Sequence, residues 1–347
     1  MIRTPVVTSA AFYDRDGSIT IREMPVAAPQ RGELLVRITA CGICPGEARG
    51  WYVDSKAPFV LGHEPVGVIE ACGEDAGPFG VGERVFVHHH APCLSCRRCK
   101  RGDHAQCETW RANRLVPGGM SRFAIVPAQT VAADVLPLPD WIDDDVATFI
   151  EPLATVVKSV RRARIRRGDR VLVIGLGVMG LLHVMLAESA GVEAVYGSDV
   201  VGSRRAKAVE VGARQAFDAD GLAGKILDAT DGEGADVVIV GPGSVAAMDA
   251  AAACVARGGT ILLFTPLPPD ARWPMPVNDL YFKDVSVVTS YSAGPDETRE
   301  ALRLLEKGLP VKPLITHRFG LDDVSEAYRM VTAAGEALKV IVYPDRS

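Results

Sequence analysis

The sequence lacks the positive charge that proteins use to bind nucleic acids. Its formal net charge is -5 over 347 residues, whereas nucleic-acid and anionic-membrane binders usually present a basic surface. We therefore expect neither partner. The local exception is Arg161–Arg167, which holds five arginines. We interpret this stretch as the solvated last turn of a helix, because positive charge suits a helix C-terminus.

Long hydrophobic runs and targeting segments are also missing. The longest uncharged run, 171–187, is interrupted by glycines and is shorter than the usual bilayer span. The first eleven residues show neither the apolar segment of a signal peptide nor a transit-peptide pattern. No internal repeat or low-complexity segment is visible. We therefore expect a cytoplasmic protein, and its length suggests about two domains.

Cysteines are few, and half of them are clustered. Four of the eight follow the spacing C-x2-C-x2-C-x7-C in a polar, turn-rich segment: Cys93, Cys96, Cys99 and Cys107. Four thiolates at such spacing favour a tetrahedral Zn²⁺, and a closed shell of four cysteines leaves no position for a substrate. Without a secretion signal, metal binding is favoured over disulfides. The cluster therefore predicts a structural zinc site.

The hydrophobic pattern changes near Ile150. Before it, short alternating stretches predict a mainly β region, with strands at Leu34–Ile38, Val66–Glu70, Arg84–Val87 and Phe123–Val126. After it, strands and helices alternate, which predicts βαβ units and a parallel sheet. The predicted strands are Val171–Ile174, Ala194–Ser198, Val237–Val240, Ile261–Phe264 and Lys339–Tyr343. The predicted helices are Glu151–Arg164, Thr298–Lys307 and Asp322–Ala334, with further helices starting near Met179, Ser203 and Ser244.

A glycine-rich fingerprint follows the first strand of the second region. Gly175-Leu176-Gly177-Val178-Met179-Gly180 is G-x-G-x-x-G between a predicted strand and a predicted helix, and Asp199 ends the next strand. The glycines allow the backbone to approach a pyrophosphate at the helix N-terminus. Asp199 would accept hydrogen bonds from the ribose hydroxyls and repel a 2'-phosphate, so NAD is favoured over NADP. Arg204 could weaken that preference, or pack over the adenine, or be solvated.

Three features together resemble the zinc-dependent medium-chain dehydrogenase/reductase family, whose members are alcohol dehydrogenase-like. They are the Gly-His-Glu signature of Gly62–Gly73, the four-cysteine segment and the later G-x-G-x-x-G. The resemblance covers essentially the whole chain, and Glu151-Pro152-Leu153 narrows it toward the sorbitol (polyol) and threonine dehydrogenase branch. It implies an α/β protein with a GroES-like β-rich catalytic domain (1–152), a Rossmann doubly wound parallel sheet (153–293) and a C-terminal segment (294–347) returning to the first domain. It also implies a homodimer or homotetramer.

The resemblance further implies a second, catalytic zinc. Its ligands would be Cys44, His63 and Glu64, while Glu151 would hold the zinc water or replace a ligand. Cys41 lies three residues before Cys44 and competes for the thiolate role, because C-x2-C is itself a ligand pattern. Spacing does not separate the two cysteines, and the family match favours Cys44.

One position departs from the family pattern. Two residues after the ligand cysteine, the family usually has Ser or Thr, which passes the alcohol proton toward solvent, and then Asp. Here the two residues are Gly46 and Glu47. A glycine cannot relay a proton. We hypothesise that Glu47, Glu151 or a water takes over, or that the substrate supplies a neighbouring hydroxyl.

Several other residues admit a structural interpretation as well as a functional one. His88-His89-His90 is interpreted as a strand end leading into the cysteine segment rather than as a third metal site, because a single His carries little ligand information and we expect no other ligands to cluster beside it. Trp51 and Tyr52 would line the substrate site or pack on the surface. His317 and Lys339 recur in the family near cofactor and substrate, or lie on the surface here.

The sequence therefore predicts an oxidoreductase. It would transfer a hydride between NAD and a secondary alcohol or ketone of a polyol, sugar or cyclitol, amino-sugar-like substrates included, with zinc assistance. A nucleic-acid-binding zinc ribbon is disfavoured by the acidic charge. A catalytically altered protein that binds NAD in a structural or regulatory role remains the alternative, because of Gly46.

Overall fold

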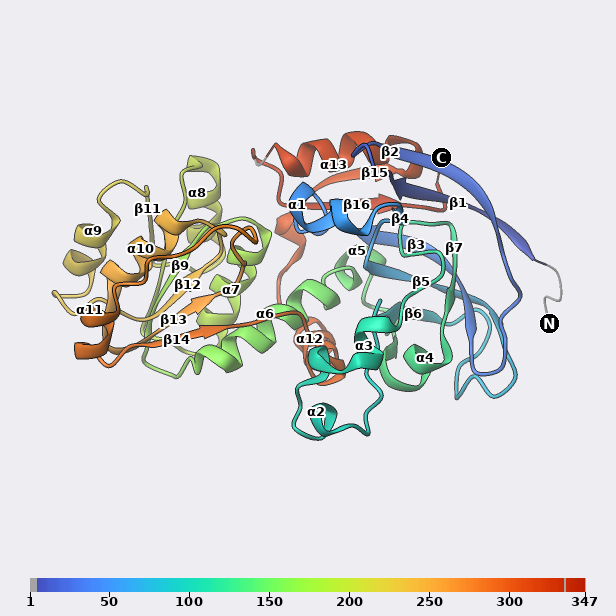
Figure 1. Ribbon diagram of the computed structural model, residues 1–347, viewed down its shortest axis with the longest axis horizontal. Helices are drawn as coiled ribbons and strands as arrows, with labels where there is room; N and C mark the ends of the chain where they lie inside the picture. The colour runs from blue at the N-terminus through green and yellow to red at the C-terminus, as the bar shows by residue number, and fades with distance from the viewer. Residues whose placement is uncertain (1–4, 334, 347) are drawn as a thin grey trace. The chain divides into compact units, whose positions relative to one another are not determined.

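The computed structural model describes residues 5–333 and 335–346, and its contacts divide the chain into two units. The divisions fall between Ala154 and Thr155 and between Ser292 and Ala293. The boundaries predicted from the sequence lie beside them, at 152/153 and 293/294. One unit thus combines the N-terminal half of the chain with its C-terminal segment, and the other is continuous (Figure 1).

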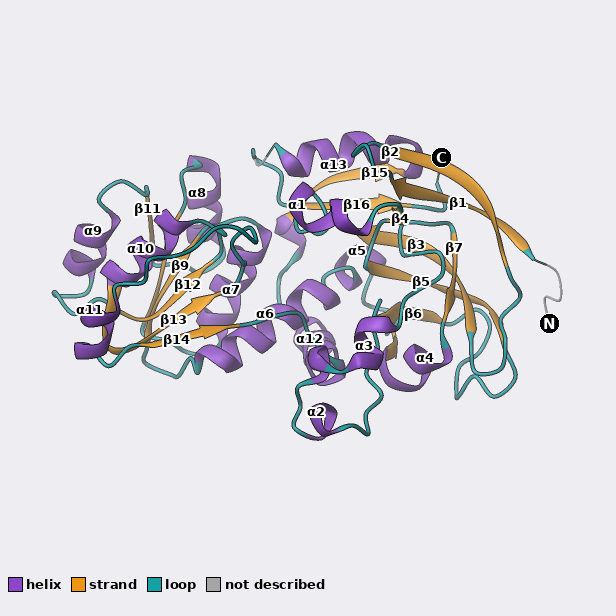
Figure 2. Cartoon of the chain, viewed as in Figure 1, coloured by secondary structure: helices purple, strands orange, loops and turns teal. Residues whose placement is uncertain are grey.

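The first unit is built on a seven-stranded sheet of order β15-β16-β3-β5-β6-β8, with β7 also paired to β3, and on a three-stranded sheet of order β2-β1-β4. Its strands are β1 (Val6–Tyr13), β2 (Ile19–Val26), β3 (Leu34–Gly42), β4 (Phe59–Val60), β5 (Glu64–Cys72), β6 (Arg84–Val87), β7 (Phe123–Val126), β8 (Val135–Pro137), β15 (Ile315–Gly320) and β16 (Lys339–Tyr343). Strands dominate this unit, as the sequence predicts (Figure 2).

Helices of the first unit are short, apart from two in the C-terminal segment. They are α1 (Gly50–Val53), α2 (Arg97–Lys100), α3 (Glu108–Ala112), α4 (Ala128–Asp134), α5 (Asp144–Ala147), α12 (Pro295–Glu306) and α13 (Val324–Thr332), with 3-10 turns η1 (Asp54–Lys56), η2 (His104–Gln106), η3 (Lys312–Leu314) and η4 (Leu321–Asp323). The predicted helix 322–334 begins two residues late as α13 and ends at Thr332; Ala334 lies outside the described residues.

The C-terminal segment completes the sheet of the first unit. Strand β16 is buried along its whole length and pairs antiparallel with β3, with Ile341 opposite Gly42. Since β3 also pairs with β5, over Leu34–Gly42, residues near position 340 lie beside residues near positions 42 and 64. This pairing brings side chains from both ends of the chain to one site.

The second unit is a six-stranded parallel sheet of order β11-β10-β9-β12-β13-β14. Counted along the chain this order is 3-2-1-4-5-6, the order of a dinucleotide-binding Rossmann sheet. The strands are β9 (Arg170–Ile174), β10 (Ala194–Ser198), β11 (Gln215–Phe217), β12 (Ala235–Val240), β13 (Val255–Leu263) and β14 (Ser286–Thr289). The helices are α7 (Val178–Ser189), α8 (Gly202–Glu210), α9 (Leu222–Ala229), α10 (Val245–Cys254) and α11 (Val277–Phe282), and α6 (Ile150–Ala163) crosses the division between the units.

All five arginines of the 161–167 stretch are exposed, as the sequence predicts. Arg161 and Arg162 lie in the last turn of α6, and the other three follow the helix. None of the helices in the described residues has the length and apolar character that a membrane span requires.

Candidate metal and cofactor sites

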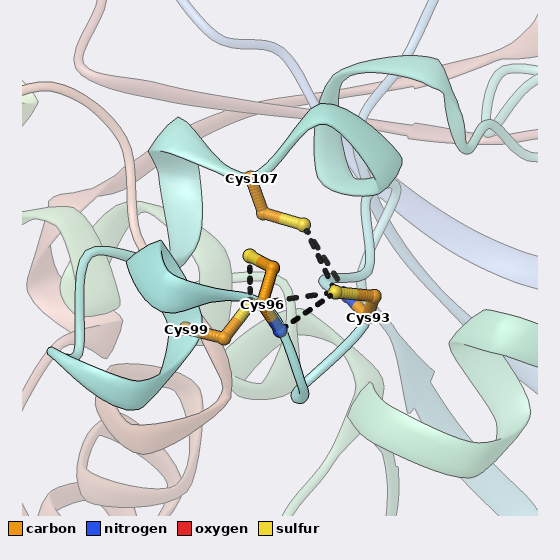
Figure 3. A group of neighbouring side chains, drawn as sticks. All are labelled: Cys93, Cys96, Cys99 and Cys107. Atoms are coloured by element: carbon orange, nitrogen blue, oxygen red, sulfur yellow. Dashed lines mark hydrogen bonds between the residues drawn. The ribbon is translucent and has the colours of Figure 1, made fainter.

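The four clustered cysteines converge on one point. Figure 3 shows their sulfur atoms turned toward one another. The Sγ–Sγ distance is 3.5 Å between Cys96 and Cys99, 3.6 Å between Cys107 and Cys93, and 3.9 Å between Cys93 and Cys99. A tetrahedral shell with Zn–S bonds of ~2.3 Å requires sulfurs about 3.8 Å apart. The residues therefore fit a closed zinc shell.

The polypeptide around Cys93 and Cys107 already favours their thiolates. The backbone N–H of Cys96 donates to Cys93 Sγ over 3.4 Å, and that of Cys93 donates to Cys107 Sγ over 3.4 Å. The hydroxyl of Ser95 is the main cause that lowers the pKa of Cys93 to about 5. Only Cys99, Ala105, Cys107 and Trp110 form the buried core of this segment among the described residues, so a metal would provide much of its stability.

A second group of metal-binding side chains forms where β3 ends and β5 begins. Cys44 follows β3, and His63 and Glu64 stand at the start of β5; their ligand atoms all lie within 4.8 Å of one another. The N–H of Gly46 donates to Cys44 Sγ over 3.4 Å. Cys41 is fully buried and donates to the carbonyl of Gly42, and burial raises the pKa of its thiol. This geometry favours Cys44 over Cys41 as the thiolate ligand.

Gly62 gives His63 its position. Its φ of +87° is left-handed, and a Cβ there would lie 2.5 Å from the backbone nitrogen of Met120, so only glycine suits this turn. The N–H of Gly62 donates to Glu47 over 3.1 Å, and the same carboxylate accepts from His63 Nδ1 over 2.8 Å. A carboxylate on Nδ1 fixes the imidazole tautomer and leaves Nε2 free to bind a metal.

Glu47 therefore positions His63. The hydroxyl of Tyr328, on α13, donates to its other oxygen over 2.6 Å. Burial opposes its ionisation, but the charge of His63 and the hydrogen bonds from His63, Tyr328 and Gly62 outweigh burial and lower its pKa. These contacts give Glu47 a positioning role toward His63, and the relay through Glu47 stays a prediction.

Glu64 has a buried cationic partner. Lys339 Nζ, at the start of β16, donates to Glu64 Oε2 and also to the carbonyl of Thr148 over 3.1 Å. Both side chains are almost fully buried. The two carboxylates predicted beside the zinc therefore have different partners. Glu64 is paired with Lys339, whereas Glu151 lies in a group with His88 and His89.

Glu151, in the first turn of α6, lies with His88 and His89, and their ligand atoms are within 4.8 Å of one another. Burial raises the pKa of the Glu151 carboxyl. The sequence interpretation that no other ligand clusters beside the three histidines was therefore wrong, because Glu151 comes from a helix about 60 positions away. The role of Glu151 at the catalytic zinc stays a prediction. His90 instead contacts the carbonyl of Asn113 through Nδ1 over 2.9 Å.

The glycine fingerprint of the second unit forms a tight strand-to-helix turn between β9 and α7. Gly175 has a φ of +87°, and a Cβ on Gly180 would lie 1.9 Å from the carbonyl oxygen of Gly175. A Cβ on Gly177 would meet only Arg204 Nη1, at 3.8 Å, among the described residues. Val178 and Met179 open the helix. The turn therefore has open space at a helix N-terminus, which fits a pyrophosphate.

Asp199 lies directly after β10 and is held toward this turn. Its Oδ2 accepts from the N–H of Leu176 over 2.7 Å, and its Oδ1 accepts from the N–H of Val201 over 2.8 Å. The fingerprint and the acidic residue that the sequence singled out are thus in direct contact, which fits a ribose-binding carboxylate.

Comparison with known proteins identifies the family of the chain. Residues 30–140 match the family described as alcohol dehydrogenase GroES-like domain, and residues 178–307 match the family described as zinc-binding dehydrogenase. A sorbitol dehydrogenase from Halalkalibacterium halodurans is 30% identical, over 94% of this chain and 96% of the relative. The chain belongs to the zinc-dependent medium-chain dehydrogenase family.

Other relatives of this dehydrogenase carry different substrates in their names. An L-threonine 3-dehydrogenase from Pyrococcus furiosus is 31% identical, over 92% of this chain and 93% of the relative. A structure described as a zinc-binding dehydrogenase from Sinorhizobium meliloti, bound to NADP, is 28% identical and superposes with a TM-score of 0.87 over 98% of this chain and 100% of its own. The predicted family, branch and GroES-like plus Rossmann fold are confirmed, and the protein is a dehydrogenase.

Some site residues of the dehydrogenase were not singled out by sequence. Tyr328, Asp134 and Thr298 carry no motif. Only the fold brings Tyr328 to Glu47, Asp134 to His88 and Thr298 to Asp134. Lys339 was named for its family position, and the structure adds its partner, Glu64. Trp51 and Tyr52 form α1 after the Cys44 turn, and His317 bonds its neighbour Thr316.

Proposed function

We propose that this dehydrogenase transfers a hydride between NAD and a secondary alcohol or ketone of a polyol, sugar or cyclitol, amino-sugar-like substrates included. The observation that carries the proposal is the group of Cys44, His63 and Glu64, in which Glu47 holds His63 in the tautomer that binds a metal. The names of the relatives, sorbitol dehydrogenase among them, support a hydroxyl-rich substrate.

The donor set fits Zn²⁺ in an open site. Thiolate, imidazole and carboxylate are all zinc ligands, and three protein ligands leave a coordination position for a substrate oxygen. A bound zinc supplies a Lewis acid that withdraws charge from that oxygen. Cys44 and His63 would hold the ion, Glu47 would keep the imidazole oriented, and Lys339 would limit the negative charge that Glu64 brings.

Activity on a substrate panel tests the proposal. Purified protein is assayed for NADH absorbance with polyols, sugars, cyclitols, amino sugars and threonine. We expect turnover with at least one hydroxyl-rich secondary alcohol and a loss on the order of a thousandfold in Cys44→Ser, because the metal contributes several kcal/mol. Cys72→Ser, in β5 away from the metal group, is the matched control and should remain active. Intact NAD binding without turnover across the panel would favour the structural or regulatory alternative.

We propose NAD as the cofactor because Asp199 faces the fingerprint turn. A carboxylate there accepts hydrogen bonds from ribose hydroxyls and repels a 2'-phosphate. Asp199→Asn keeps an acceptor oxygen for Leu176 and removes the charge. We expect the ratio of kcat/KM for NAD over NADP to fall roughly 10- to 100-fold, the size of one charge-assisted hydrogen bond. An unchanged ratio would assign cofactor choice to other residues, such as Arg204.

A further inference from the structure

His88 and His89 have no role in the proposed reaction, and Glu151, which the sequence assigns to the catalytic zinc, lies with them. His88 follows β6, and Glu151 lies in the first turn of α6, so two separate elements supply this cluster. Their ligand atoms lie within 4.8 Å of one another. Two imidazoles and one carboxylate are a common donor set for zinc and for other divalent transition metals.

His88 is prepared as a ligand by a chain of buried hydrogen bonds. Its Nδ1 lies 2.7 Å from Asp134 Oδ2, and Asp134 Oδ1 accepts from the hydroxyl of Thr298 over 2.6 Å. Because a carboxylate accepts but does not donate, the proton of a neutral His88 lies on Nδ1, and the lone pair of Nε2 is available to a metal. This carboxylate–histidine arrangement is the one that orients imidazoles on metals.

The lone pair of His88 lacks a protein partner. Its side chain is 0% exposed, and Nε2 has no hydrogen-bond partner among the described residues. Nδ1 of His89 is likewise buried and without a partner there. Glu151 is 5% exposed. Unsatisfied polar atoms in such a place cost free energy unless something binds them.

The size of the gap suits one ion. Ligand atoms around zinc lie roughly 3.3–3.5 Å apart at bond lengths of ~2.0–2.2 Å, so the present separations would close by at most about 1.5 Å. The cluster adjoins the Cys44 group, since the rings of His89 and His63 have centroids 4.8 Å apart.

We propose that His88, His89 and Glu151 bind a further divalent transition-metal ion, a third per chain, beside the catalytic zinc site. Glu151 offers a carboxylate oxygen to this ion. The ion would satisfy the lone pairs of both histidines and the charge of the buried carboxylate.

Metal counting tests the site independently of any substrate. The full-length protein is loaded with zinc and desalted, and the number of zinc ions per chain is measured by inductively coupled plasma mass spectrometry. We expect three zinc ions per chain in the wild type and two in His88→Gln, with Asp134→Asn binding the third ion 10- to 100-fold more weakly. His317→Gln is the matched control, because it also removes an imidazole, and should keep three. Cys44→Ser should lose a different ion and retain the one that His88→Gln loses.

Two zinc ions per chain in the wild type would overturn the proposal, and so would an unchanged count of three in His88→Gln. If His88→Gln does not fold, the half-buried His89→Gln should show the same loss of one ion. Cobalt titration of the wild type needs no variant, and saturation at two equivalents would also contradict a third site. Inactivity on polyols would leave these counts unaffected, so this test and that of the proposed function fail separately.

Discussion

At the scale of single residues, Gly46 marks the departure from the family's proton path. Its backbone lies outside the left-handed region, and a Cβ there would meet Cys44 Sγ at 3.4 Å, an ordinary contact. We expect Gly46→Ser to fold normally and to place a hydroxyl where the family has one. Turnover should rise severalfold, because a positioned hydroxyl speeds proton transfer. The part of the pH–rate profile that depends on proton release should shift as well. Steady-state kinetics between pH 5 and 10 measure both.

Ala48→Ser is the control, because it adds a hydroxyl to the same turn at a different position. It should leave the profile unchanged. If Gly46→Ser also changes neither turnover nor the profile, the proton does not pass through this position.

His183, buried in α7, is expected to make the second unit acid-sensitive. Burial lowers its pKa from 6.5 to about 4, although its Nδ1 contacts the carbonyl of Met179 and its Nε2 contacts Ser159. Between these values the unfolded chain binds more protons than the folded one. The contribution of His183 to the free energy of unfolding is therefore complete above pH 6.5 and is lost as the pH falls through about 4. The loss amounts to at most about 3 kcal/mol.

The difference in unfolding free energy between wild type and His183→Gln measures this contribution, because other acid-sensitive groups cancel. Urea unfolding at several pH values from 4 to 7 should show the wild type losing its advantage as the pH falls. A difference that stays constant over this range would mean that His183 is protonated at the same pH in both states.

Which site residues the sequence can predict depends on how local their signal is. Cys44, His63, Asp199 and the glycines stand in short motifs whose backbone geometry the chemistry requires, and the structure brings each set together. Tyr328 contacts Glu47 across 281 positions. Such a contact depends on how β16 and α13 return to the sheet, and no local pattern encodes that pairing.

At the scale of elements, the segment Cys93–Cys107 is held together by its cysteines. Its small core gives it little stability of its own. We expect Cys96→Ser to lose one zinc relative to the wild type, and proteolysis within the segment to become faster. Metal analysis and limited trypsin digestion, at the exposed Arg97 and Arg98, measure these effects. Gln106→Ala, at an exposed position of the same segment, keeps all four ligands and should behave as the wild type. An unchanged zinc count in Cys96→Ser would contradict the structural site.

Elements differ in how well their sequence predicts them. The buried strands β9, β10 and β12 are continuous apolar runs bounded by turns, so they were predicted within one or two residues. Strands β11 and β14 were not predicted. Both are short edge strands of the parallel sheet and largely exposed, so their composition carries no hydrophobic pattern.

At the scale of the whole molecule, the open edge of the Rossmann sheet points to self-association. Strand β14 pairs with β13 on one side and with no other strand in the described part of the chain. Beside it, α11 exposes Tyr281 (75%) and Phe282 (71%), and Val287 on β14 is also exposed. An unpaired edge next to exposed aromatics invites pairing with a second copy, and a two-fold arrangement places β14 against itself.

We therefore expect a homodimer of about twice 37.0 kDa in light scattering coupled to size exclusion. Val287→Lys puts a charge on the pairing edge, and two like charges then face each other across the two-fold axis. The variant should elute as a monomer, or dissociate at protein concentrations at which the wild type stays dimeric. Val209→Lys, on the exposed face of α8, adds the same charge elsewhere and should remain dimeric. A wild type that is monomeric at micromolar concentration, or a Val287→Lys variant as dimeric as its control, would exclude β14 as the interface.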